Sequence, residues 1–142
     1  MPHIQGMIYD SKTVLVLRQD LAAWQVANVA AFLAGGLAGA HPHIIGEPYR
    51  DGQGREYTPL IREPVFVLGA TLEELRRTHL RALSRELKLA IYIESMFTTT
   101  NDADNRATVA AAPVEALDFV GIGLHGPRRT VDKTVNGLKF LS

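Results

Sequence analysis

The spacing of apolar and polar residues divides the first third of the chain into a strand and a helix. Residues 13–17 are β-branched and aliphatic with no polar alternation, which is typical of a strand covered on both faces. Asp20 can then cap a helix that an Ala-rich sequence carries to Gly35 and Gly36. Because apolar residues surround most of this helix, we expect deep burial, with a second copy of the chain as a candidate cover.

A second strand and helix follow a stretch of turn-forming residues at 40–64. Residues 65–68 are apolar and predict the strand. Thr71, with Glu74 three residues later, forms a capping box that marks the start of the helix. The apolar stripe of this amphipathic outer helix comprises Leu72, Leu75, His79, Ala82 and Leu83.

The last third of the chain repeats the alternation. Residues 89–93 predict a third strand, and residues 98–113 predict a polar loop that leads to a short helix. Residues 119–124 predict a fourth strand, after which Pro127 can start a last helix that Asn136 and Gly137 end. Two successive strand–helix units favour an α/β sheet with a parallel crossover.

Composition narrows the class of protein. A chain of 142 residues with 46% hydrophobic content fits one compact domain over residues 1–142. Fifteen basic and fifteen acidic side chains leave no net field for nucleic acid, and the absence of Cys fits a reducing compartment. The start of the sequence lacks a signal-peptide pattern, and no run reaches about twenty apolar residues. We therefore expect a cytoplasmic protein without a membrane span.

The sequence predicts neither a metal site nor a cofactor. His41 and His43 flank Pro42, but a metal needs further ligands, and the remaining histidines are distant in sequence. Those histidines are His3, His79 and His125. The Gly-rich stretch at 52–54 has no strand before it and no helix after it, so it does not predict a dinucleotide site.

Four local matches, in order, resemble the second class of peptidyl-tRNA hydrolase, and more closely an uncharacterised domain-of-unknown-function family of that fold. The matching stretches are residues 14–21 (VLVLRQDL), 26–28 (VAN), 93–98 (IESMFT) and 121–139, which contains GIG, GP, VD and GLK. The resemblance covers most of the chain. It implies a three-layer α/β/α domain, a mixed four-stranded sheet whose last strand is antiparallel, and a homodimer.

The resemblance also implies site residues, with departures. Asn28 stands where those enzymes have Gln, and Trp24 stands where they have an active-site Lys. Their acidic residue and Thr correspond to Glu94 and Thr98, although their Asp-Ala-Gly signature is absent here. An ammonium grips phosphate or polarises an ester carbonyl, whereas an indole offers one N–H donor and a broad apolar face. The replacement of Lys by Trp24 therefore changes the chemistry.

Three functions remain open. The first is a diverged pocket between Asp20, Trp24, Asn28, Glu94 and Thr98 that binds a small planar ligand or hydrolyses another substrate. The second is ester hydrolysis on peptidyl-tRNA, with Glu94 as the base and Thr98 as a polar anchor. The third is a homodimeric interaction module. The arginines at 76, 77, 81 and 85 can meet RNA phosphates, but the outer face of a capped helix needs no such role, and we favour that interpretation, so tRNA is not the favoured partner.

Overall fold

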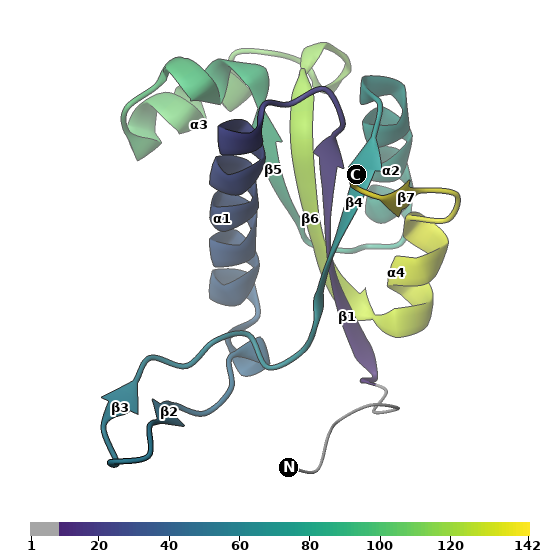
Figure 1. The fold of residues 1–142 in the computed structure, drawn as a ribbon. Coiled ribbons are helices and arrows are strands. Elements are labelled where there is room, and N and C mark those ends of the chain that lie inside the picture. The colour runs from purple at the N-terminus through teal and green to yellow at the C-terminus, as the bar shows by residue number, and fades with distance from the viewer. Residues whose placement is uncertain (1–8) are drawn as a thin grey trace.

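The computed structural model describes residues 9–142 and builds a mixed five-stranded sheet between helices (Figure 1). The strands of this sheet are β1 (Ser11–Arg18), β4 (Val65–Ala70), β5 (Leu89–Ile93), β6 (Phe119–Pro127) and β7 (Lys139–Phe140). Their order is β5-β6-β1-β4-β7, with β1 and β4 parallel. As expected, the strand after residue 118 is antiparallel, pairing with both β1 and β5.

The expected strand count was wrong, because β7 adds a fifth strand that pairs antiparallel with β4. Its two residues, Lys139 and Phe140, are exposed and too short to give a hydrophobic pattern. The turn before it uses Gly137, whose φ of 93° suits glycine. A two-residue strand of this kind depends on its neighbour in the sheet rather than on its own sequence.

The helices form a layer on each face of the sheet, and α3 lies beside the amino-terminal end of α1 (Figure 1). The helices are α1 (Ala23–Ala40), α2 (Leu72–Ser84), α3 (Asp102–Ala110) and α4 (Arg128–Thr134). Helix α1 covers one face, mainly over β6 and β5, and α2 and α4 cover the other. Short 3-10 turns are η1 (Pro42–Ile44), η2 (Glu94–Thr98) and η3 (Val114–Ala116).

Helix α1 differs from its expected bounds at both ends. It starts at Ala23 after Ala22, whose N–H donates to the side chain of Gln25 at 2.9 Å. Asp20 does not cap it, because the Asp20 carboxylate accepts from Arg18 instead. The helix also continues through Gly35 and Gly36 to Ala40, since neither glycine adopts a positive φ that would end it.

The expectation of deep burial for α1 was also wrong, because one face of the helix is buried and the other is exposed. Val29, Leu33 and Leu37 are at most 1% exposed against the sheet, whereas Trp24 and Phe32 are 62% and 57% exposed. The uncharged sequence of α1 hides this asymmetry. Helix α1 is long and apolar enough to cross a membrane, but the core helix of a globular domain can have the same length and composition.

Helix α2 begins as the sequence predicts. Thr71 accepts from the N–H of Glu74 at 3.1 Å, and Glu74 accepts from the N–H of Thr71 at 2.9 Å. Of its expected stripe, Leu75, His79 and Ala82 are buried, but Leu83 is 52% exposed. The stripe is narrower than expected because the sheet covers one side of the helix.

The segment at 45–62 leaves the body between α1 and β4, and we call it the arm. It carries the small hairpin of β2 (Tyr49–Arg50) and β3 (Glu56–Tyr57). Figure 1 shows the hairpin standing away from the sheet below α1. Backbone bonds close its base, from Gly46 N–H to the Leu60 carbonyl at 2.9 Å and from Arg62 N–H to the Ile44 carbonyl at 2.8 Å.

Candidate functional site

Four aromatic rings form a continuous row at one end of the domain. The ring centroids of Trp24 and Phe97 lie 5.7 Å apart, those of Phe97 and Tyr92 lie 5.2 Å apart, and those of Tyr92 and Phe32 lie 5.7 Å apart. Helix α1 supplies the two outer rings, while β5 and η2 supply the inner two. Spacings of 4.5–7 Å are those that aromatic pairs favour.

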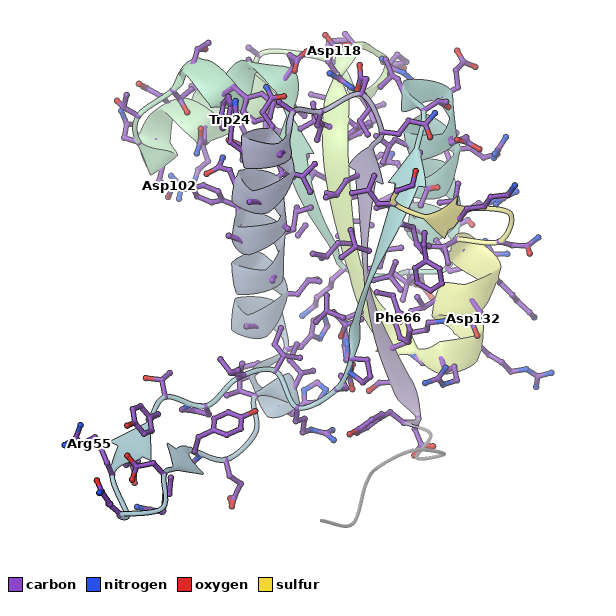
Figure 2. The ribbon with its side chains drawn as sticks, in the orientation of Figure 1. Trp24, Arg55, Phe66, Asp102, Asp118 and Asp132 are labelled. Atoms are coloured by element: carbon purple, nitrogen blue, oxygen red, sulfur yellow. The ribbon has the colours of Figure 1, made fainter. Side chains whose placement is uncertain are left out.

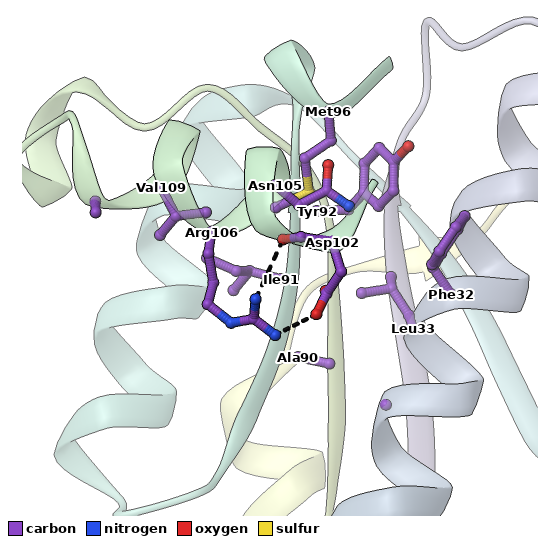
Figure 3. Close-up of a pocket in the computed structure, with 12 residues that line it drawn as sticks. Phe32, Leu33, Ala90, Ile91, Tyr92, Met96, Asp102, Asn105, Arg106 and Val109 are labelled. Carbon is purple, nitrogen blue, oxygen red and sulfur yellow. Dashed lines mark hydrogen bonds and ion pairs between the residues drawn. The ribbon is translucent and has the colours of Figure 1, made fainter. Parts of the chain in front are cut away.

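This aromatic row lines a cavity of about 510 Å³ between α1, η2 and α3. A second cavity of about 430 Å³ continues along α3 (Figure 3). The residues that line both are Phe32, Tyr92, Met96, Asp102 and Asn105. The two cavities are thus one groove, here called the aromatic groove. Figure 2 shows Trp24 and Asp102 at the same end of the molecule. The groove falls in the size range of small-molecule sites.

Amide and hydroxyl groups interrupt the apolar lining of the aromatic groove. The side-chain nitrogen of Asn28 donates to the Tyr92 hydroxyl at 3.3 Å. Thr99 bonds to Asn105, and Asp102 pairs with Arg106 on the exposed side of α3. These contacts fix the polar groups in place. Because the Arg106 charge is already paired with Asp102, the lining has little free cationic character.

A second polar group sits at the carboxyl end of β1. Arg18 donates from Nε to Asp20 at 2.6 Å and from Nη2 to Glu94 at 3.1 Å, so that one guanidinium joins two of the expected site residues. Partial burial disfavours the Arg18 charge, but the hydrogen bonds to Asp20 and Glu94 outweigh it and raise the pKa of Arg18. A cavity of about 320 Å³ lies beside Arg18 and Asp20, with Thr71 on its wall.

The five expected site residues fall into three places. Trp24 and Asn28 line the aromatic groove. Asp20 and Glu94 meet at Arg18. Thr98 donates from its hydroxyl to the Ser95 carbonyl at 2.9 Å within η2, which is a capping contact. The Arg18 pairing and the Thr98 contact lie at the edge of the sheet where β1 and β5 end. Strand β6 lies between those two strands.

Four titratable side chains gather at the opposite end of β1. The rings of His41, His43 and His125 lie close together, and the Nδ1 atom of His125 is 3.2 Å from the buried carboxylate of Glu63. Within residues 9–142, no group of three or more His, Cys, Asp or Glu side chains is arranged to hold a metal ion. His3 lies outside the described residues.

Comparison with known proteins places the chain in a family. A model of the family described as "Protein of unknown function (DUF2000)" matches residues 11–142. The chain belongs to the DUF2000 family. A solved structure of a protein of unknown function from Agrobacterium tumefaciens strain C58 is similar to this DUF2000 chain with a TM-score of 0.91 and 41% identity, covering 95% of this chain and 100% of the other. A search of curated proteins finds no match.

Several groups at these sites were not expected from the sequence of this DUF2000 protein. Phe32, Tyr92 and Phe97 have the apolar character of core residues, and nothing in their spacing indicates that they flank a groove. Arg18 does carry a signal, because a charge directly after a buried strand needs a partner. Asn101 caps α3 by accepting from the Asp104 N–H at 2.8 Å, as its position in a polar loop before a helix suggests.

Proposed function

We propose that this DUF2000 protein binds a small ligand with a planar apolar part in the aromatic groove, with Trp24 stacking against it. The observation that carries the proposal is the exposure of the two outer rings of the row. Trp24 is 62% exposed and Phe32 is 57% exposed, although both belong to a row that continues into buried Tyr92. Aromatic surface left open in a concave site is typical of ligand binding.

The lining favours an uncharged ligand. The polar groups around the rings are amides, hydroxyls and the Asp102 carboxylate, and the cation on the wall of the second cavity, Arg106, is paired with Asp102. Amides such as that of Asn28 donate and accept at once, which suits a heteroaromatic ring edge. A phosphate or carboxylate ligand needs a cation or a helix N-terminus that is free to meet it. In α3, however, the Asp104 N–H already donates to the Asn101 side chain, and Asp102 and Asp104 place negative charge in the first turn.

The replacement of Lys by Trp24 also favours an uncharged ligand. In the peptidyl-tRNA hydrolases that the chain resembles, an ammonium at this position can grip phosphate. Here the position carries the ring that ends the aromatic row. The change from a cation to an indole supports a move from phosphate chemistry toward stacking.

A thermal-shift and fluorescence screen with purine, pyrimidine, indole and flavin-type heterocycles tests the proposal. Trp24 is the single tryptophan of the chain, so its emission reports directly on the groove. A ligand should change the emission saturably and raise Tm. The variant Phe32→Ala should weaken binding, whereas Leu80→Ala, which removes a similarly exposed residue on α2, should not. Equal weakening by both variants would remove the groove as the site.

Ester hydrolysis on peptidyl-tRNA is the second candidate function, and the Arg18 pairing favours it. Arg18 pairs with the carboxylates of both Glu94 and Asp20, and Arg18 and Asp20 line a cavity. A fixed carboxylate can orient a water for attack on an ester. Release of free tRNA by purified protein, abolished in Glu94→Gln, would support this function. Release that is unchanged in Glu94→Gln would remove Glu94 as the base.

A homodimer is a separate proposal, supported by the exposed side of α1. The helix carries no charged residue, and its outer side leaves Trp24 and Phe32 open to solvent. Light scattering coupled to size-exclusion chromatography measures the mass directly. A dimer that Phe32→Asp converts to a monomer would support the interface, and a wild-type monomer would refute it. Ligand binding by a monomer would show that the role of α1 in the aromatic groove does not depend on a dimer interface.

A further inference from the structure

A buried carboxylate organises the end of β1 that lies away from the aromatic groove. Glu63 is 5% exposed, and both of its oxygens accept hydrogen bonds, from the Ser11 hydroxyl at 2.7 Å and from the Thr13 hydroxyl at 2.7 Å. His125 lies beside them, with Nδ1 2.9 Å from the Thr13 oxygen and 3.2 Å from Glu63. These bonds hold the Glu63 carboxylate and the His125 ring in one orientation.

Three imidazole rings pack together above this carboxylate. The ring centroids of His41 and His125 are 4.6 Å apart, those of His43 and His125 are 5.5 Å apart, and those of His41 and His43 are 5.9 Å apart. The Nε2 atom of His41 is buried and has no hydrogen-bond partner among residues 9–142. Neutral rings tolerate this packing, but charged rings at these distances repel one another.

The cluster stands at the two ends of the arm. His41 and His43 precede the arm at 45–62, and Glu63 follows it directly. The Arg62 guanidinium also donates from Nε to the His43 carbonyl at 3.2 Å. His125, near the end of β6, connects the two ends of the arm to the sheet. Backbone bonds close the base of the arm, so the rings and Glu63 act on how that closed base is held against the sheet.

The charges around the rings oppose proton uptake. Burial lowers the pKa of His41 first, and the neighbouring rings of His125 and His43 and the ammonium of Lys88 lower it further. Burial also lowers the pKa of His125, although Glu63 partly offsets this; His43 and Arg62 act in the lowering direction. Among these groups Glu63 carries the negative charge, and one carboxylate balances one imidazolium, so His41 and His125 cannot both be charged without leaving one of them without a counter-ion.

We propose that His41, His43, His125 and Glu63 form a proton-sensitive clamp that fixes the arm to the sheet at neutral pH and releases it when His41 and His125 take up protons. The clamp is independent of the aromatic groove, which lies at the other end of the strands. Histidine is the side chain whose protonation suits a change between pH 7.5 and 5.5. Released, the arm and its exposed Tyr49 and Tyr57 are free to reorient.

Distances between two spin labels test the clamp in the full chain. The sequence has no Cys, so Gly52→Cys at the tip of the arm and Arg129→Cys on α4 give one labelled pair. The labelled protein is diluted with unlabelled protein so that distances within one chain are measured. A chelator is present to remove metal ions. At pH 7.5 we expect one narrow distance distribution. At pH 5.5 we expect that peak to be lost, because each unit of pKa difference between clamped and released rings shifts the equilibrium about tenfold.

Two variants separate the clamp from a general effect of acid. The double variant His41→Gln and His43→Gln leaves His125 as the remaining ring, and Glu63 balances its charge, so this variant should give the same distribution at both pH values. His79→Gln removes a histidine that packs on Phe119 in the opposite layer, and it should keep the wild-type response. The change in the distance distribution between pH 7.5 and pH 5.5 is compared within each protein. A double variant that is already loose at pH 7.5 would show that the rings hold the arm, and the wild-type response to pH then decides whether proton uptake releases it.

Four results would overturn the clamp. The first is a wild-type distribution that does not change with pH, and the second is a pH response that survives in the double variant. The third is loss of the sheet signal in circular dichroism at pH 5.5, which would mean that the whole domain unfolds. The fourth is tightening of the arm by Zn²⁺ in the wild type alone, which would make the cluster a metal site.

Discussion

Gly121 of β6 lies directly beneath Val29 of α1, so close that a Cβ added at Gly121 would lie 2.8 Å from Val29 Cγ1. The added Cβ would also lie 2.9 Å from Cδ1 of Leu33, on the next turn of α1. This close approach sets the height of α1 above the sheet. It also sets the position of Trp24 and Phe32, which α1 carries to the aromatic groove.

Gly121→Ala should therefore lower the free energy of unfolding by about 1–3 kcal/mol, the usual cost of forcing an extra methyl group into a packed core. Urea denaturation measures the change. Gly35→Ala is the matched control, because a Cβ at Gly35 meets nothing within 4 Å. That variant should stabilise α1 by about 0.5–1 kcal/mol, since Ala is the better helix former. A destabilised Gly35→Ala, or a neutral Gly121→Ala, would contradict the packing described.

Thr71→Ala should destabilise the domain by about 1 kcal/mol, because it removes the acceptor for the Glu74 N–H at the start of α2. Thr71→Ser keeps that acceptor and should stay close to wild type. Thermal unfolding compares the two variants. If Ser costs as much as Ala, the loss comes from the methyl group and not from the cap.

The stability of the protein should fall as the solution is acidified below pH 6.5. Burial lowers the pKa values of His41, His79 and His125 below 6.5, so the unfolded chain binds more protons there than the folded chain. Glu63 acts in the same direction at lower pH. Burial opposes its charge, but the Thr13 and Ser11 hydroxyls lower its pKa below 4.5, so its contribution is present above 4.5 and lost as the pH falls toward the folded value.

Urea unfolding at pH 7.5, 6.5, 5.5 and 4.5 measures this dependence. His79→Gln removes one of the three histidines whose pKa is lowered by burial and should reduce the slope between pH 6.5 and 5.5. A free energy of unfolding that is constant, or higher at pH 5.5 than at 7.5, would show that these histidines are not buried as described.

The local elements could be read from the sequence because local signals specify them. The capping box at Thr71 placed the start of α2, and the apolar run at 89–93 gave β5 with its observed bounds. The predicted burial and end of helix α1 were wrong because its residues carry no charge. The spacing of polar residues therefore indicated neither its exposed side nor its continuation past Gly35. Asp20 has the residue type and position of a helix cap. Its pairing with Arg18 depends on the three-dimensional geometry and could not be read from the sequence.

The groupings of side chains were harder to predict because they are not local. His41, Glu63 and His125 lie far apart in the sequence and come together through the order of the strands. The aromatic groove likewise needs α1, β5 and η2 to be placed first. Trp24 and Asn28 were expected to share a site, and they do line one cavity. Their use by a ligand stays a prediction.

The most direct test of the ligand proposal is the emission of Trp24 during titration with uncharged heteroaromatic compounds, followed in wild-type protein and in Asn28→Ala. The indole is 62% exposed beside Phe97, so an occupied groove must change its surroundings. We expect a saturable change that is weaker in Asn28→Ala and unaltered in Leu80→Ala. Emission that ignores every class of compound, while Phe32→Ala leaves all thermal shifts unchanged, would contradict the proposal.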